Sequence, residues 1–170
     1  VSINAGTGSV SLGAVGDSGH TEIHNLTVAG DAGITLNGAI YTSGSSAVGS
    51  EGADITFSDP VIINGTVIID SDDTTASTVA LDGDIVFTTS IQSETNGTDS
   101  LTLTSGAGTI TLPAIGGSNK PLTSFVATSN ALTISNDITT TGLIDINAPV
   151  TLGGDVIISS GTGAGNVEFS

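Results

Sequence analysis

Residues 101–117 read LTLTSGAGTITLPAIGG, and residues 1–16 read VSINAGTGSVSLGAVG. Each stretch joins two short segments of alternating apolar and polar residues through a turn that contains two glycines. Alternation with a period of two places aliphatic side chains on one face of a β-strand and Thr or Ser on the other. Two copies of this unit, starting at positions 1 and 101, predict a chain built from repeated short strands.

The similarity between the two copies continues to the end of the chain. Residues 34–36 match 132–134, residues 55–61 match 144–150, and residues 65–69 match 154–158. The offset falls from 100 to 98, 89 and 82 positions, always through residues missing between strands, with extra residues in the first copy at roughly Ser45 to Ala53. Insertions confined to loops are typical of a solenoid. We therefore predict a single β-solenoid over residues 1–170, made of two degenerate repeats at about 1–100 and 101–170.

Strand units of this kind occur along the whole chain, and almost every one is followed by Gly, Asn, Asp or Ser, which are typical turn residues. No window shows the apolar spacing of an amphipathic helix. Roughly 20 strand units at about three per coil predict about seven coils of about 24 residues. The alternative that this pattern leaves open is a pair of tandem β-sandwiches of about 85 residues each.

The charge of the chain excludes several classes of function. Seventeen acidic residues stand against one base, Lys120, which gives a net charge of −16. Such a chain cannot form the basic patch that nucleic acid or anionic lipid requires. It contains no Cys, so disulfides, thiolate metal sites and Cys nucleophiles are excluded. A mean hydropathy of +0.35 argues against acidic disorder, and no apolar run reaches the length of about 18 residues that membrane insertion needs.

Both ends of the chain look like strands that belong to a continuing pattern. It opens directly into Val1-Ser2-Ile3 and closes on Val167-Glu168-Phe169. We expect it to be a section of a larger protein. The near absence of Lys and Arg removes the cleavage sites of trypsin-like proteases, which suits an extracellular location.

The amino-acid sequence of residues 1–16, 101–117 and 131–170 resembles the β-strand repeats of giant bacterial exoproteins. These include filamentous-haemagglutinin-like adhesins and autotransporter-like surface proteins. The resemblance covers nearly the whole chain and lies in composition and period. It implies a right-handed parallel β-helix, export to the cell surface, and a structural role as an adhesin stalk, filament or sheath subunit. The partners that it implies are neighbouring repeats or copies of the same protein, and a host or cell-surface glycan.

Two polar clusters are candidates for metal binding. On a strand, His20, Glu22 and His24 would share a face and could converge as zinc ligands, although an exposed polar face explains them equally well. The turn Asp70-Ser71-Asp72-Asp73 offers the hard oxygen ligands that Ca²⁺ prefers, against the simpler interpretation of a solvated turn. Residues 49–54 faintly resemble the calcium-binding nonapeptide of β-rolls. Ca²⁺ is therefore the one cofactor that the sequence suggests, and we assign no metal ligands.

No set of residues predicts catalysis. Asp82-Gly83-Asp84 supplies two acids, but the chain has no Arg, and Lys120 stands alone as a base. Lys120 is also the sole donor available for an intramolecular isopeptide bond. We predict a non-enzymatic protein. The alternative function is a glycan- or calcium-binding module of a surface adhesin, formed by the Ser45–Asp54 insertion or the Asp70–Asp73 turn.

Overall fold

The computed structural model describes residues 1–18, 23–43, 53–72, 82–117, 119–161 and 165–170. These residues form twenty short β-strands and no helix. The strands are β1 (Ser2–Asn4), β2 (Val10–Leu12), β3 (Leu26–Ala29), β4 (Ile34–Leu36), β5 (Ile40–Tyr41), β6 (Ile55–Phe57), β7 (Val61–Ile63), β8 (Thr66–Asp70), β9 (Ile85–Phe87), β10 (Ser90–Ser93), β11 (Ser100–Thr104), β12 (Thr109–Leu112), β13 (Ala114–Ile115), β14 (Ser124–Thr128), β15 (Ala131–Ile134), β16 (Ile138–Thr140), β17 (Ile144–Asn147), β18 (Val150–Leu152), β19 (Ile158–Ser160) and β20 (Val167–Phe169). Nothing in this part of the chain is a helix that could cross a bilayer.

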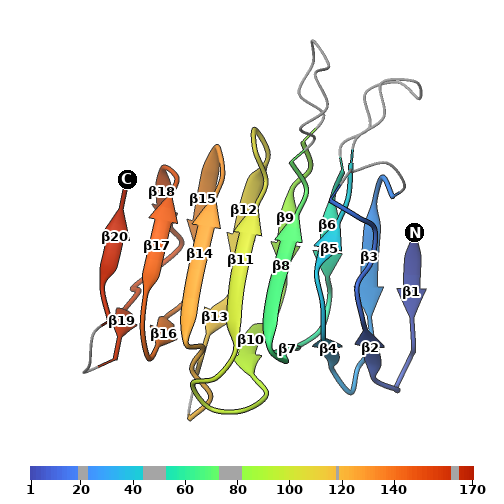
Figure 1. Ribbon diagram of the computed structural model, residues 1–170, viewed down its shortest axis with the longest axis horizontal. Coiled ribbons are helices and arrows are strands. Elements are labelled where there is room, and N and C mark those ends of the chain that lie inside the picture. Colours follow the sequence, from blue (N-terminus) through green and yellow to red (C-terminus); the bar gives the residue numbers. More distant parts are fainter. Residues whose placement is uncertain (19–22, 44–52, 73–81, 118, 162–164) are drawn as a thin grey trace.

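The strands form three parallel sheets. Sheet A has the order β1-β3-β6-β9-β12-β15-β18, sheet B has β2-β4-β7-β10-β13-β16-β19, and sheet C has β5-β8-β11-β14-β17-β20. Successive strands visit A, B and C in turn, so every three strands complete one coil, and seven coils follow one another along the long axis (Figure 1). In the first coil, an isolated parallel bridge from Val15 to Ile40 takes the place of a sheet C strand. The predicted β-helix of about seven coils is confirmed, and the tandem-sandwich alternative is wrong because all paired strands run parallel.

Alternation along each strand places the aliphatic side chains in the centre of the coils. In β8, Val67 and Ile69 are fully buried, whereas the intervening Ile68 is only partly covered. Aliphatic residues stack on one another from coil to coil. In sheet B, for example, Ile34 pairs with Val61, and Val61 pairs with Ile91. Each fully buried aliphatic side chain contributes about 1.5–3 kcal/mol relative to an exposed one. The stack of such rows forms one continuous apolar column.

Coil length varies far more than the uniform estimate of about 24 residues. Leu132 pairs with Val150, 18 positions later, whereas Ile69 pairs with Leu103, 34 positions later. The strand registers nevertheless continue without a break, so the variation is absorbed at the corners. The insertion predicted at Ser45 to Ala53 lies outside the described residues except for Ala53.

The matched strands of the two sequence copies lie on different sheets. Ile3 belongs to sheet A, whereas its match Leu103 belongs to sheet C; Ile34 belongs to sheet B, whereas its match Leu132 belongs to sheet A. When the Val15 bridge is counted as a strand position, matched strands are eleven positions apart, one fewer than the twelve positions of four coils, so every match moves back by one sheet. The three faces of the coil therefore accept the same strand sequence, while the division into two repeats stays a prediction.

Gly116 is required where two coils approach closely. Its φ of 71° lies in the left-handed region, and a Cβ atom at this position would lie 2.1 Å from the carbonyl oxygen of Thr139 in the next coil. Only glycine combines that conformation with that approach at low cost. This is the kind of corner that allows the backbone to keep circling.

Candidate functional site

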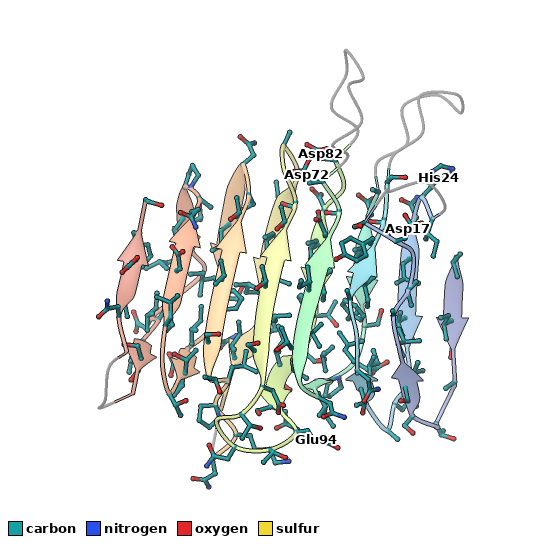
Figure 2. The ribbon with its side chains drawn as sticks, viewed as in Figure 1. Asp17, His24, Asp72, Asp82 and Glu94 are labelled. Carbon is teal, nitrogen blue, oxygen red and sulfur yellow. The ribbon has the colours of Figure 1, made fainter. Side chains whose placement is uncertain are left out.

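The acidic candidates gather at the corner where sheet C leads to sheet A of the following coil, which we call the acidic corner (Asp54, Asp72, Asp82 and Asp84). Figure 2 shows Asp72 and Asp82 close together at this corner, with Glu94 at the opposite edge of the sheets. The corner repeats in successive coils, so its side chains form a vertical series. Such carboxylates can either coordinate a ligand or accept hydrogen bonds that stabilise the fold.

Two of the carboxylates bind the backbone of the next coil. Asp54 Oδ1 accepts a hydrogen bond of 2.9 Å from the backbone N–H of Asp84, and Asp84 Oδ1 accepts one of 2.8 Å from that of Thr109. Asn25 Oδ1 begins the series by accepting 3.0 Å from the N–H of Asp54. Each side chain thus satisfies a donor at the start of the next sheet A strand, which is a structural task.

Asp72 and Asp82 converge on the next coil at Gly106. A Cβ atom at Gly106 would lie 2.4 Å from Asp82 Oδ2 and 2.8 Å from Asp72 Oδ1. Asp82 Oδ2 also accepts 2.6 Å from the N–H of Ala107, while Asp70 Oδ1 accepts 3.0 Å from the N–H of Asp72. The members of the predicted pair Asp82 and Asp84 therefore bind different backbone donors of the same turn.

The metal hypotheses are only partly covered by the structure. Asp73 and residues 49–52 lie outside the described residues, as do His20 and Glu22. His24 is exposed, and its Nδ1 lies 2.9 Å from the carbonyl oxygen of Ser43. Within the described part of the chain, no group of three or more His, Asp or Glu side chains is arranged to hold a metal ion. The calcium and zinc hypotheses both stay predictions.

Ser71, inside the predicted acidic turn, belongs to a buried row of hydroxyl side chains. It is fully buried, and its Oγ donates 2.8 Å to the carbonyl of Gly83. Its neighbours along the row at the end of sheet C are Thr42, Ser105 and Ser129. Thr42 likewise donates to the carbonyl of Ala53 and Ser129 to that of Ala131, whereas the Ser105 hydroxyl is the one buried side-chain group without a partner among the described residues. These four buried hydroxyl side chains border the apolar column at the end of sheet C.

Asp99 is a buried carboxylate that sequence patterns did not single out. It is 4% exposed and accepts hydrogen bonds from the Ser93 hydroxyl, from Gly65 N–H at 2.7 Å and from Thr95 N–H at 3.1 Å. Burial alone would raise the pKa of Asp99, but these donors together with the backbone of Glu94 hold its pKa below the ordinary value. A single Asp after an Asn-Gly turn carries no periodic signal, so only the fold reveals its role.

Lys120 joins two loops of neighbouring coils. Its Nζ donates 2.9 Å to the carbonyl oxygen of Glu94, and its own carbonyl accepts 3.1 Å from the N–H of Ser93. Pro121 continues this contact by accepting 2.9 Å from the N–H of Gly97. The only Lys or Arg side chain of the protein thus contacts the loop that carries Asp99.

The exposed large apolar side chains lie in the first and last coils of the described chain. They belong to Val1, Leu152, Ile157, Val167 and Phe169. Phe169 pairs with Ile146, and Leu152 pairs with Ile134, and both of these partners are fully buried. Leu152 and Phe169 therefore continue rows of side chains that are buried within the stack.

No protein-family model, curated protein or solved structure matches this chain.

Proposed function

We propose that this chain is a structural section of a secreted bacterial cell-surface protein, an adhesin stalk, filament or sheath subunit without catalytic activity. The observation that supports this most directly is the unbroken parallel register through all seven coils. One row of sheet B illustrates it, with an aliphatic residue at every coil: Val10, Ile34, Val61, Ile91, Ile115, Ile138 and Ile158. A continuous column of this kind gives a rod with no natural hinge along it.

The proposed role is mechanical. From the second coil onward, three ladders of backbone hydrogen bonds join each coil to the next, so bending the rod would have to open one side of several ladders at once. Each coil advances the stack by about 4.8 Å, and seven coils therefore span only about 30 Å. A projection of useful length needs further coils, which is the property expected of one section within a longer assembly.

The charge distribution opposes lateral association of one rod with another. Asp145 and Glu168 pair directly on the outer face of sheet C, and the chain as a whole carries −16. Like charges repel at close range and are screened by salt over about 8–10 Å at physiological ionic strength. Lateral association is therefore opposed along the acidic faces, which keeps the sections dispersed and extended.

Immunogold electron microscopy on intact cells of the source organism tests this proposal. Antibodies raised against the purified chain should label surface fibres or projections without permeabilisation, and the labelled structures should be longer than a single 170-residue section. Labelling that appears only after permeabilisation would contradict the surface role. Labelling of compact particles would contradict the rod.

The calcium-binding alternative has one observation in its favour, the convergence of Asp72 and Asp82 at Gly106. Isothermal titration calorimetry with Ca²⁺ tests it on the whole chain. A saturable heat that is lost in Asp72→Ala, but kept when the exposed Asp31 is changed to Ala, would favour a calcium module. No heat beyond that of Mg²⁺ at equal ionic strength would favour the purely structural role.

A further inference from the structure

We propose that Asn96 is the site at which this protein deamidates spontaneously, because the fold leaves its side-chain amide open to attack. The two other Asn-Gly pairs of the chain, Asn37-Gly38 and Asn64-Gly65, are protected by hydrogen bonds. An Asn followed by Gly is the most reactive context for this modification, since glycine has no side chain to hinder the attacking nitrogen. The inference goes beyond the proposed structural role and does not depend on it.

The reaction needs only water as a second reactant. The backbone nitrogen of Gly97 loses its proton to solvent base and attacks Cγ of Asn96, which forms a cyclic succinimide. The Cγ–Nδ2 bond breaks, and the side-chain nitrogen takes up a proton and leaves as ammonia. Water then opens the ring at either carbonyl and leaves aspartate or β-linked isoaspartate. The side-chain amide must therefore turn toward the backbone, and the glycine N–H must be released.

All three pairs lie where sheet B leads to sheet C, so the same dipeptide occurs in different surroundings. Asn37 and Asn64 come directly after β4 and β7, whereas Asn96 lies within the longer connection from β10 to β11, residues 94–99. Figure 1 shows this connection extending beyond the strand ends, and Glu94 at its start is labelled in Figure 2. All three Asn residues are exposed, so exposure alone does not rank them.

Side-chain hydrogen bonds hold the amides of Asn37 and Asn64. Asn37 Nδ2 donates 3.0 Å to Ser11 Oγ and 3.1 Å to the carbonyl oxygen of Leu12. Asn37 Oδ1 accepts 2.8 Å from Asn64 Nδ2, which extends the ladder to a third coil. The Asn37 amide can turn toward Gly38 only after all three bonds break, and the Asn64 amide can turn only after one of them breaks.

The backbone nitrogen of the Asn64-Gly65 pair is held as well. Gly65 N–H donates 2.7 Å to Oδ1 of Asp99, a buried carboxylate. A negative charge beside this N–H opposes its deprotonation, and a charge-assisted hydrogen bond is roughly twice as strong as a neutral one. Gly65 is therefore a poor nucleophile while the fold is intact.

Asn96 has the weakest protection of the three. No described residue forms a hydrogen bond with its side chain, so the amide can turn without breaking such a bond. Gly97 N–H donates 2.9 Å to the carbonyl oxygen of Pro121 in the next coil, which is a neutral acceptor. Asn96, Gly97 and Thr98 also lie in a turn outside the strands, where local opening costs the least free energy.

Deamidation at Asn96 changes the loop and leaves the coil stack in place. The reaction adds one negative charge, and isoaspartate lengthens the backbone between β10 and β11. Asp99 holds the base of this loop by accepting hydrogen bonds from the Ser93 hydroxyl and from Thr95 N–H. The aged chain should therefore keep its circular dichroism spectrum and a melting temperature close to that of the fresh chain.

Peptide mapping by mass spectrometry tests the assignment on the purified whole chain. The folded protein would be kept in mildly alkaline buffer, and aspartate and isoaspartate at each Asn-Gly pair would be measured over time. Asn96 should react at least about tenfold faster than Asn37 or Asn64. In concentrated guanidinium chloride the rates at the three pairs should differ only slightly, because the protecting hydrogen bonds are lost.

A folded chain in which Asn37 or Asn64 reacts as fast as Asn96 would overturn the proposal. So would a folded chain that leaves Asn96 intact while the denatured chain reacts. An Asn96 preference of the same size in the denatured chain would show that local sequence, and not the fold, selects the site. Loss of the coil stack on ageing would contradict the position of Asn96 outside it.

Two variants provide a second test. Asn96→Gln should remove most of the deamidation from the folded chain, because glutamine cyclises far more slowly than asparagine. Asn37→Ala removes the acceptor of the Asn64 side chain, so it should raise the rate at Asn64 and leave the rate at Asn96 unchanged. An unchanged rate at Asn64 would contradict protection by the side-chain ladder. Equal increases at Asn64 and Asn96 would contradict it too, because they would reflect general opening of the fold.

Discussion

Phe57 and Phe87 lie one above the other in successive coils of sheet A, with ring centroids 4.9 Å apart and ring planes inclined by 19°. Both side chains are buried, at 0% and 2% exposure. Stacked aromatic pairs add about 0.5–1.5 kcal/mol beyond the burial of their area. The pair joins the third and fourth coils, and it is one of the side-chain contacts between successive coils that together form the apolar column.

We predict that Phe87→Ala lowers the free energy of unfolding by about 3–5 kcal/mol, because it leaves a cavity under Phe57. Phe87→Leu should cost less. The control is Val86→Thr on the same strand, which faces outward and should change stability by no more than about 0.5 kcal/mol. Chemical denaturation followed by circular dichroism measures both. Equal losses from Phe87→Ala and Val86→Thr would mean that Phe87 is not in the core.

Asp99 should make stability depend on pH. Its pKa is lowered on folding, so its contribution is fully present above the ordinary aspartate pKa of about 3.9 and is lost as pH falls through the lower folded value. Asp99→Asn should destabilise the protein by about 1–3 kcal/mol at neutral pH, because the Ser93, Gly65 and Thr95 donors lose a charged acceptor.

Denaturation curves between pH 7 and pH 2 check this prediction. The difference between Asp99→Asn and the natural chain should shrink as the pH falls below about 4. Asp31→Asn, on an exposed position, is the matched control and should follow the natural chain. A difference that stays constant down to pH 2 would show that the Asp99 charge does not stabilise the fold.

Two adjacent glycines should respond differently to the same substitution. Gly116→Ala should cost more than about 1 kcal/mol, because its φ is positive and the added methyl would meet the Thr139 carbonyl. Gly117→Ala should be neutral or slightly stabilising, since nothing lies within 4 Å of its Cβ position. Thermal melts of the two variants provide the measurement, and a larger loss from Gly117→Ala would contradict the described corner.

The chain should resist trypsin even when unfolded. Its one basic residue, Lys120, is followed by Pro121, and trypsin does not efficiently cleave a Lys–Pro bond. Trypsin in moderate urea should therefore leave the full-length chain, whereas Pro121→Ala should release two fragments under the same conditions. Gel electrophoresis and mass spectrometry distinguish the outcomes. Efficient cleavage of the natural chain would remove protease resistance as a support for an exposed location.

Salt should stabilise the protein without regard to the identity of the cation. At −16 the folded chain repels itself, and raising the ionic strength shortens the Debye length from about 30 Å at 0.01 M to about 8 Å at 0.15 M. The melting temperature should therefore rise with NaCl. Ca²⁺ and Mg²⁺ at equal ionic strength should act alike, and Asp72→Ala should not alter the response to Ca²⁺. A rise specific to Ca²⁺ that Asp72→Ala abolishes would favour the calcium module.

The period-two pattern predicts the coil stack well, because burial in a narrow column depends on little except which side of the strand a residue occupies. The pattern Val67-x-Ile69 and its many equivalents establish strand and face together. The sheet to which a strand belongs is not encoded in the same way. Ile3 and Leu103 match in sequence yet lie on different sheets, because all three faces offer the same environment.

Polar side chains at the corners were less predictable. Asp54 and Asp84 bind backbone N–H groups one coil away, and Asp99 collects donors from Gly65 and Ser93. Ser93 lies only six positions from Asp99, but the three contacts with backbone N–H groups join residues about 25 to 35 positions apart through coils of unequal length, so a local motif cannot signal them. Acidic turns consequently resemble ligand sites in the sequence even where their oxygens serve the backbone.

Distances between nitroxide labels on the sheet A row test the coil stack most directly. The row contains Thr27, Thr111, Thr133 and Thr151, with Thr111 three coils after Thr27 and the others one coil further each. Double electron–electron resonance on Thr27→Cys paired with each of the other three as Cys should give mean distances that increase by about 5 Å per step. Distances that fail to increase along this series would contradict the parallel stack of coils.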